Sequence, residues 1–403
     1  MAGKHNPAGW PRRSRLLPYA ALLIAAASLA AACAHQIPAG NGADARPAAR
    51  LAIAEPGAPA ASAHRLALVS ASFTSPSKGW LLAVPPCALN TKPCRILLLR
   101  RTTDGGKTWA DKPAPDAPFA SPGSGGDAVG SILFTSSRDG WAFGPGLWQT
   151  RDGGATWRRL SIPGGPVLTM AAGDGRVLAA TGRCTASGQD CRFGVYTSRT
   201  GSTTWRPVPA ATARGAGAPA LFVAGHTGYL ASNLPLHGRT VLLAGPVTGS
   251  ARWRPLRNNP CMRPSSMAVA AAAGGRLFIG CGSEPGAGQQ LKTAYLSGDY
   301  GRTWRRVANP PSGGYIGSAS MTRGGTIFLS GGRMDIYVSR NRGRSWHVSQ
   351  SLNSAASQAG AGFDLLAVAT GNTTGYATQR GVYRQQLWLT GDGGRRWTPV
   401  TVR

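Results

Sequence analysis

Acidic residues are scarce in this chain of 403 residues. Asp and Glu number 15 against 44 Lys and Arg, and only two of the acids, Glu55 and Glu284, are glutamates. Glycosidases need a pair of facing carboxylates, so few residues here qualify for such chemistry. The sequence also has no Gly-x-Ser-x-Gly, His-Glu-x-x-His or phosphate-loop pattern, and its six histidines show no metal-ligand spacing. These absences argue against a serine hydrolase, a zinc protease and a nucleotide-binding enzyme.

Long helical periodicity is absent as well, while glycine (56) and proline (30) are abundant. This composition is typical of an all-β chain with many tight turns. One octapeptide recurs, best seen at residues 150–157, in which Ser or Thr, Asp, Gly and Trp keep fixed places. Close copies end at Trp109, Trp304 and Trp397, and weaker ones at Trp205, Trp253 and Trp346. The seven tryptophans lie 48, 48, 48, 51, 42 and 51 residues apart, which predicts a stacked repeat architecture.

The octapeptide predicts a tight turn between two strands. Its Asp can accept hydrogen bonds from backbone N–H groups, its Gly supplies a positive φ, and its Ser or Thr hydroxyl adds a local bond. Its Trp begins the return strand and is expected to pack across the hairpin. A bound cation is the alternative, but one carboxylate per turn offers calcium too few ligands. We therefore assign structural roles to Asp104, Trp109, Asp152, Trp157, Asp299, Trp304, Asp392 and Trp397.

The pattern Ser/Thr-x-Asp-x-Gly-x-Thr-Trp resembles the Asp-box, or bacterial neuraminidase repeat, of sialidase-like β-propellers. A second element, Asp-Gly-Trp at residues 139–141 with a counterpart at residues 79–80, is similar to one in the photosystem II assembly and stability factor propellers. The resemblance covers about residues 65–403. It implies an all-β fold, a single seven-bladed β-propeller of four-stranded antiparallel blades. It also implies a protein client, and in such families the boxes lie on the blade rim, away from any binding site.

Blade 2 is the template for the strands. Residues 129–134, 141–143 and 146–150 are predicted as its first three strands, and the fourth begins at Trp157. The turns after the first and third strands are tight and hold the repeat motifs. The links after the second and fourth strands are longer, as at residues 206–219, and they emerge together on one face. A binding site is expected at that face and at the channel mouth. This register leaves no strand exchange to close the ring.

The first 33 residues predict an export signal. Lys4 and three arginines precede an apolar segment at residues 16–32, which ends in Leu-Ala-Ala-Ala-Cys33. This end resembles a bacterial lipobox, although Ala30 stands where Leu is usual, so we expect lipidation of Cys33. Ordinary cleavage beside Ala32 stays open as an alternative. A retained membrane anchor is disfavoured, because Pro18 and the alanine-rich end make a poor span.

Residues 34–64 are rich in Ala, Gly and Pro and predict a disordered tether before a propeller at residues 65–403. The protein is then expected at the outer face of the cytoplasmic membrane as a lipoprotein, or secreted. Of the seven cysteines, only Cys33 lies outside the repeats. The other six can form three disulfides in an oxidising compartment, and separated pairs without paired histidines argue against zinc. The expected pairs are Cys87–Cys94, Cys184–Cys191 and Cys261–Cys281.

The net charge is +29, and the removal of the signal, with its one lysine and three arginines, leaves +25. A field of this size draws a protein toward anionic surfaces such as phospholipid headgroups, envelope polysaccharides or acidic glycans. The alternative is that dispersed arginines keep the protein soluble. Arginines recur just past the box tryptophans, which spreads charge around the rim. No nucleic-acid module is recognisable, so nucleic acid is not an expected partner, and a monomer is expected.

A sialidase-type site needs an arginine triad, a Tyr activated by a Glu and an acidic proton donor. The two glutamates are poorly placed for this, since Glu55 falls in the tether and Glu284 follows Cys281. Asp127 and Asp364 each precede an inner strand, although each could simply cap its loop. As binding residues we single out Asp127, Arg263, Tyr315 and Asp364. The expected protein is a lipid-anchored scaffold without cofactor or metal, and a glycan-binding or glycoside hydrolase propeller is the alternative.

Overall fold

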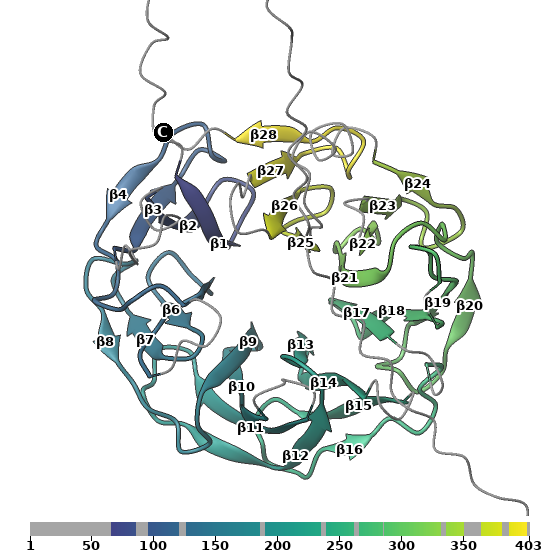
Figure 1. Ribbon diagram of the computed structural model, residues 1–403, viewed down its shortest axis with the longest axis horizontal. Coiled ribbons are helices and arrows are strands. Elements are labelled where there is room, and N and C mark those ends of the chain that lie inside the picture. Colours follow the sequence, from purple (N-terminus) through teal and green to yellow (C-terminus); the bar gives the residue numbers. More distant parts are fainter. Residues whose placement is uncertain are drawn as a thin grey trace, which may run out of the picture. The chain divides into compact units, whose positions relative to one another are not determined.

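The computed structural model describes residues 66–85, 96–120, 126–185, 190–234, 239–261, 266–284, 286–331, 336–349, 364–380 and 387–400. Within these residues, 28 strands form seven sheets of four strands each, and no helix occurs. The strands of a sheet are consecutive in the chain and antiparallel, and the sheets stand around a central axis with the first strand of each innermost (Figure 1). The predicted seven-bladed, all-β propeller is confirmed.

The blades follow the chain in order. Blades 1 to 4 contain β1 (Ala67–Phe73), β2 (Gly79–Val84), β3 (Leu98–Thr102), β4 (Ala110–Lys112), β5 (Ser131–Phe134), β6 (Gly140–Phe143), β7 (Leu147–Thr150), β8 (Arg158–Arg159), β9 (Val167–Gly173), β10 (Arg176–Cys184), β11 (Cys191–Arg199), β12 (Arg206–Gly215), β13 (Ala220–Ala224), β14 (Thr227–Leu234), β15 (Arg239–Pro246) and β16 (Arg254–Pro255). Blades 5 to 7 contain β17 (Ser266–Ala272), β18 (Arg276–Gly282), β19 (Lys292–Ser297), β20 (Arg305–Val307), β21 (Ile316–Met321), β22 (Ile327–Gly331), β23 (Ile336–Ser339), β24 (His347–Val348), β25 (Asp364–Ala369), β26 (Gly375–Arg380), β27 (Leu387–Thr390) and β28 (Thr398–Val400).

The apolar core lies between neighbouring blades, because each strand presents alternate side chains to the sheets on its two sides. One cluster joins blades 1 and 2 through Trp80, Leu99 and Phe134. The rings of Trp80 and Phe134 stack with their centroids 4.0 Å apart. Equivalent clusters join blades 2 and 3, 3 and 4, 4 and 5, and 5 and 6. Side-chain packing therefore holds the sheets together.

The Gly-Trp element has a steric basis. Gly140, the first residue of β6, pairs with Phe134 on one side and with Thr150 on the other. A Cβ on Gly140 would come within 2.4 Å of the Phe134 ring, and one on Gly79 within 2.5 Å of the Phe73 ring. The phenylalanine ring of the first strand thus lies across the glycine of the second, and the two residues recur as a pair.

Among the described residues the ring closes without strand exchange, since each sheet contains only consecutive strands. Blade 7 meets blade 1 through an apolar cluster that contains Leu81, Tyr376 and Leu387. The Tyr376 hydroxyl donates a hydrogen bond of 3.0 Å to the carbonyl of Ala71, and its ring centroid lies 4.9 Å from that of Phe73. Packing and one buried hydrogen bond hold this junction. At the other junctions the chain itself also joins the neighbouring blades.

Two of the predicted disulfides are present. Cys184 at the end of β10 is bonded to Cys191, its direct partner at the start of β11. Cys261, in the link before blade 5, is bonded to Cys281 of β18. The third expected pair, Cys87–Cys94, lies outside the described residues, as do Cys33 and the segments 1–33 and 34–64.

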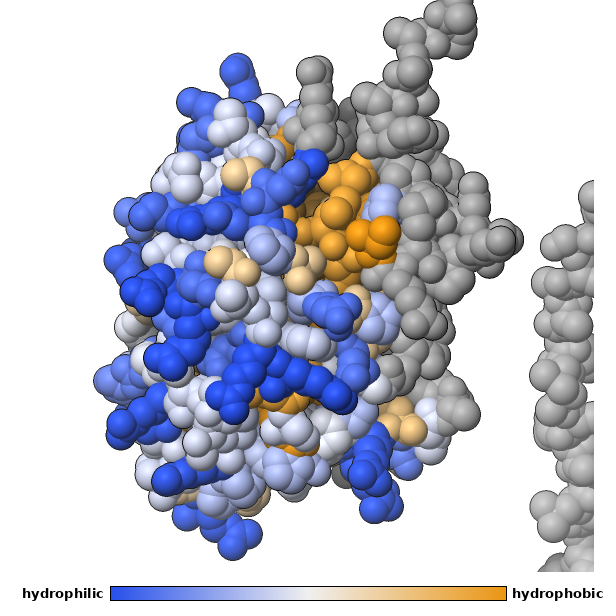
Figure 2. Space-filling model, turned by 90° about the vertical axis from the view of Figure 1, so that its left-hand side faces the viewer, coloured by the Kyte–Doolittle hydropathy of each residue, from blue (hydrophilic) through white to orange (hydrophobic). Residues whose placement is uncertain are grey.

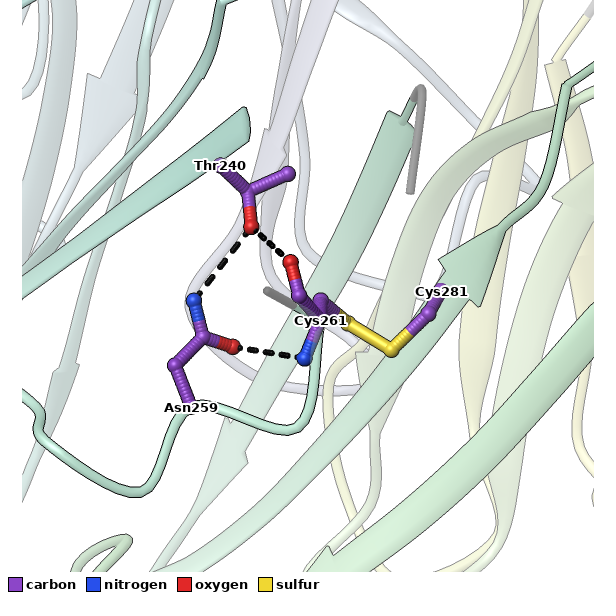
Figure 3. The surroundings of a disulfide bond; sticks show 4 residues. All are labelled: Thr240, Asn259, Cys261 and Cys281. Atoms are coloured by element: carbon purple, nitrogen blue, oxygen red, sulfur yellow. Dashed lines mark hydrogen bonds between the residues drawn. A yellow bond between two sulfur atoms is a disulfide. The ribbon is translucent and has the colours of Figure 1, made fainter. Parts of the chain in front are cut away.

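Polar side chains hold the backbone around Cys261 in place (Figure 3). The Asn259 side-chain oxygen accepts a 3.0 Å bond from the Cys261 N–H, and its amide donates to the Thr240 hydroxyl. That hydroxyl donates in turn to the Cys261 carbonyl. Since Thr240 belongs to β15, this network ties the link before blade 5 to blade 4.

The prediction of a long link at residues 206–219 is wrong. β12 occupies most of this segment and pairs with β11 in two runs, separated by an irregularity between Gly194 and Tyr196. Ala210 lies between the two runs on β12 and adopts a φ of 56°. This bulge lets the outer strand continue to the end of the blade.

In the described part of the chain, no helix is long and apolar enough to cross a membrane.

Candidate functional site

The order of the strands divides the ring into two faces. The links after the second and fourth strands of every blade emerge on one side, which we call the loop face. The turns after the first and third strands emerge on the opposite side, which we call the turn face, and every one of them lies within the described residues. The octapeptides belong to the turn face.

The octapeptide of blade 2 folds as predicted. The Asp152 carboxylate accepts bonds from the N–H and the hydroxyl of Thr156, and the Thr150 hydroxyl donates to Asp152 while it accepts from the Gly154 N–H. These bonds, first that from the Thr156 hydroxyl, lower the pKa of Asp152 to about 2. Equivalent bonds from Thr303 lower the pKa of Asp299 to about 2. The carboxylates of the boxes are therefore engaged in their own turns.

Blades 6 and 7 show how much of this pattern is needed. In blade 6 Asn341 replaces the Asp, and its side-chain oxygen still accepts from the Ser345 N–H while its amide donates to the Ser345 hydroxyl. In blade 7 Arg396 replaces the last Thr, and Asp392 keeps the bonds from two backbone N–H groups. A neutral acceptor can thus serve at this position.

The box glycines and tryptophans also contact the preceding blade. A Cβ on Gly154, whose φ is +96°, would come within 2.7 Å of Leu99 in blade 1, and one on Gly343 would come equally close to Val307 in blade 5. The indole N–H of Trp157 donates to the Pro113 carbonyl at 2.9 Å. The expectation that this Trp packs across its own hairpin is therefore incomplete, because the box also joins neighbouring blades.

Three of the four exposed large apolar residues of the described chain lie on the loop face, and the fourth, Val348, lies on an outer strand. The four are Ile96 just before β3, Leu291 just before β19, Tyr315 just before β21 and Val348 at the end of β24, with exposed fractions of 60%, 73%, 46% and 40%. Figure 2, which looks at the ring from the side of β4 and β8, shows hydrophilic residues projecting along one edge and an apolar area on the other side. Ile96 belongs to blade 1, whereas the other three belong to blades 5 and 6, on the side of the ring that Figure 2 does not show; exposed apolar residues that gather in this way can mark an interaction surface.

Leu291 and Tyr315 lie on two segments that pair with each other. Gln289 forms a parallel bridge with Gly314, and the Gln290 N–H donates to the Ser312 carbonyl. The two exposed residues follow these paired positions directly. They come from the link inside blade 5 and the link from blade 5 to blade 6.

A buried ammonium group holds this pair of segments. Lys292 is 2% exposed, and its Nζ lies 2.9–3.2 Å from the carbonyl oxygens of Gln290, Pro311, Gly313 and Gly314, which share its three N–H donors. The Tyr337 ring lies 5.5 Å from the same nitrogen. Four carbonyl oxygens and a ring face compensate the buried charge, as burial of an ammonium requires. The segment that ends at Tyr315 is thereby fixed to blade 5.

Gln290 completes the attachment. Its side-chain oxygen accepts a 2.7 Å bond from the Ile316 N–H, and its amide donates to Ser266 and to the Ser283 carbonyl. Ile316 is the residue after Tyr315, so the exposed ring is held on both sides by bonds from blade 5. This arrangement presents Leu291 and Tyr315 on a rigid support.

The three predicted binding residues within the described part of the chain lie at different blades. Asp127 is half-buried and forms an ion pair with Arg159 on the outermost strand of blade 2. Asp364 is the first residue of β25 in blade 7, where its backbone pairs with Arg380. Tyr315 is exposed beside blade 5. Arg263 lies outside the described residues.

Sequence reasoning missed Lys292 and Gln290. A signal existed, since Lys292 is one of only six lysines in a chain that otherwise uses arginine. A compact ammonium suits a cage of carbonyl oxygens, whereas a planar guanidinium does not. Among the described residues, no group of three or more His, Cys, Asp and Glu is placed to hold a metal ion.

Comparisons with known proteins bear on the family and the fold. The model of the family described as photosynthesis system II assembly factor YCF48 matches residues 63–376. The solved structure of YCF48 bound to D1 peptide is 17% identical with a TM-score of 0.51, covering 79% of this chain and 92% of that one. YCF48 from Cyanidioschyzon merolae is 17% identical with a TM-score of 0.49, covering 81% and 95%. An α-L-arabinofuranosidase from Fusarium graminearum is 16% identical with a TM-score of 0.41, covering 82% and 91%. No curated protein matches the sequence.

Proposed function

The chain belongs to the family of the photosynthesis system II assembly factor YCF48, and on that premise we propose that it binds a segment of a client protein on its loop face and catalyses no reaction. The observation that carries the proposal is the location of three of the four exposed large apolar side chains of the described residues on that face. The solved relative that holds a D1 peptide supports the same type of ligand.

The contact centre of the proposed site is the pair Leu291 and Tyr315. Tyrosine, with an aromatic ring and a polar tip, is enriched where protein partners bind, and Leu291 adds exposed apolar area on the paired segment. The buried attachment of the segment through Lys292 reduces the entropy lost when a partner binds, because the surface is already ordered. Tyr315 thus stays a proposed binding residue, as do Asp127, Arg263 and Asp364.

The proposal is tested by placing a photoreactive phenylalanine derivative at Tyr315 in the full chain, in the membranes of the cells that make it. A control chain carries the same group at the exposed Arg158 of β8 on the rim. We expect a discrete protein adduct from position 315 alone, and its loss when Leu291→Glu is added. Equal adducts from both positions, or none from position 315, contradict the proposal.

We further propose that the protein is exported and lipid-anchored at Cys33, so that its client and any anionic polysaccharide or lipid partner belong to the cell envelope. The two disulfides support an oxidising compartment. An intact-mass measurement on protein from native membranes tests this. A diacyl or triacyl increment on a chain that begins at Cys33 is expected, and an unacylated chain would refute the anchor.

The same preparation decides between the scaffold and a glycoside hydrolase. A panel of glycosides should yield no hydrolysis if the protein is a scaffold. Sugar release that disappears in both Asp127→Ala and Asp364→Ala would replace the proposal with the enzyme. The carboxylate of Asp127 already has an ion-pair partner in Arg159, which favours the structural role for this residue.

A further inference from the structure

The turn face carries a dense layer of positive charge. Its exposed cations come from all seven blades and are Lys78, Lys107, Arg138, Arg151, Arg199, Arg252, Arg302, Arg323, Arg342, Arg344, Arg395 and Arg396. Its acids are fewer and are Asp104, Asp139, Asp152, Asp174, Asp299 and Asp392. Among the described residues, none of these cations takes part in an ion pair, since the three pairs that form involve Arg100, Arg159 and His226.

The acids of this face are largely engaged in local bonds. The four box aspartates accept hydrogen bonds inside their own turns. Asp139 bonds to the Ser136 hydroxyl, and Asp174 to the ring of His226. The arginines around them extend from the tips of turns into solvent. The twelve cations outnumber the six acids, so the face as a whole carries a net positive charge, although cations and acids are equal in number in blades 2, 3 and 5.

From this distribution we propose that the turn face docks the propeller on an anionic lipid bilayer. The cations sit at equivalent turns of all the blades, so they form a layer around the ring axis and do not line one groove. A layer of this kind matches a flat anionic surface, whereas a polymer chain is better held in a groove. None of the exposed large apolar residues of the described chain lies on the turn face, so docking is electrostatic and involves no insertion.

Docking by the turn face directs the loop face away from the membrane. The lipid proposed at Cys33 does not prevent this orientation, although β1 begins on the loop face and the preceding chain leaves from there. Residues 34–64 can span up to about 100 Å when extended. A blade is only about 30 Å deep, because its strands have ten residues or fewer.

The test uses the full chain with Cys33→Ser, so that no acyl group contributes, and vesicles of phosphatidylcholine with or without phosphatidylglycerol. Two variants carry four reversals each and lower the net charge equally, by eight units. The turn-face variant has Arg151→Glu, Arg252→Glu, Arg302→Glu and Arg344→Glu. The rim variant has Arg158→Glu, Arg206→Glu, Arg254→Glu and Arg305→Glu, all on exposed residues of outer strands.

We expect binding to the anionic vesicles only, with loss at high salt because exposed charges are screened. The turn-face variant should bind at least about tenfold more weakly, and the rim variant should stay close to the parent chain. Equal weakening in both variants would mean that diffuse charge is responsible and would overturn the proposal. Absence of binding to the anionic vesicles would also overturn it. The same holds if the protein binds soluble dextran sulfate at protein concentrations at which it does not bind the vesicles.

A second turn-face variant protects the test from a folding defect. It carries Lys78→Glu, Arg138→Glu, Arg323→Glu and Arg395→Glu, at turns other than those of the first variant, and it must lose binding to the same extent. Thermal unfolding of each variant checks the fold. Tyr315→Glu serves as a separate control, since it alters the proposed client site and should leave vesicle binding unchanged.

Discussion

At the scale of single residues, the octapeptide shows whether its acidic position needs a negative charge or only a hydrogen-bond acceptor. Asp152 and Asn341 occupy equivalent positions and receive equivalent backbone bonds. The turn therefore depends on the acceptor oxygen more than on the negative charge. Substitutions that keep or remove this oxygen should differ accordingly.

We predict that Asp152→Ala lowers the free energy of unfolding by about 1–2 kcal/mol, because several bonds to the turn are lost. Asp152→Asn keeps an acceptor and a donor for Thr156, so it should lose less than half as much. The midpoint and slope of urea unfolding measure both. Equal losses in the two variants would show that the charge itself is needed.

The same aspartates make stability depend on pH. The pKa values of Asp152 and Asp299 are about 2 in the folded protein, against an ordinary value of 3.8. A lowered folded pKa gives stability that is fully present above the ordinary value and is lost as the pH falls through the folded one. Urea unfolding between pH 4 and pH 2 should show this loss, and a chain with both Asp152→Asn and Asp299→Asn should show a shallower one. Parallel curves would contradict the assignment.

Glycines on the turn face fall into two kinds, which gives a matched test. Gly154 and Gly175 both have positive φ, but only Gly154 has a neighbour, Leu99, where a Cβ would be. We predict that Gly175→Ala costs about 1 kcal/mol through the backbone alone, and that Gly154→Ala costs about 1–3 kcal/mol more through overpacking. Thermal unfolding measures the difference. Equal costs would mean that the box glycine is required by its φ and not by the contact between blades.

At the scale of elements, the link from blade 5 to blade 6 is organised by buried side chains of neighbouring segments, chief among them that of Lys292. Lys292 binds four carbonyl oxygens, three of which belong to the segment before Tyr315. A loop of this kind gains order from a buried partner and not from its own sequence. The contacts that order this link are nonlocal, so neither the turn residues nor the hydrophobic periodicity of the sequence predicted them.

We predict that Lys292→Met lowers the free energy of unfolding by about 2–4 kcal/mol, since buried carbonyl groups lose their donor. Lys292→Arg should not restore it, because the planar guanidinium cannot replace the compact ammonium. Hydrogen exchange at residues 312–316 should accelerate in both variants before the rest of the blade is affected. Unchanged exchange there would show that Lys292 is not what orders the segment.

At the scale of the whole molecule, the ring has one junction that the chain does not cross. Blades 7 and 1 meet through packing around Tyr376, whose hydroxyl bonds to Ala71. Tyr229 makes an equivalent bond from blade 4 to Tyr300 in blade 5, where the chain also connects the blades. The two tyrosines therefore form a matched pair for testing closure.

We predict that Tyr376→Phe and Tyr229→Phe each lower the free energy of unfolding by about 1–2 kcal/mol, because a buried carbonyl loses its donor. Only Tyr376→Phe should also accelerate hydrogen exchange in β1 and β26, since no covalent link limits opening at that junction. Local acceleration at both junctions, or at neither, would show that the closing junction is no weaker than the others.

The sequence by itself determined the repeat, the blade number, the turn geometry and the disulfides Cys184–Cys191 and Cys261–Cys281. The repeat, the blade number and the turn geometry follow from contacts between residues close in the chain, which recur in each blade. The two disulfides join cysteines that are 7 and 20 residues apart. The prediction of a long link at residues 206–219 was wrong. A bulge at Ala210 lets β12 continue further than the other outer strands do.

The tertiary structure alone decided which side chains are exposed together, that Asp127 pairs with Arg159, and that Lys292 supports Tyr315. It also separated the cations of the turn face from the apolar residues of the loop face, and it closed the ring through Tyr376. The physical reason is the same in each case. These arrangements join segments from different blades or from opposite ends of one blade, and no local pattern of residues records which distant partner a side chain will meet.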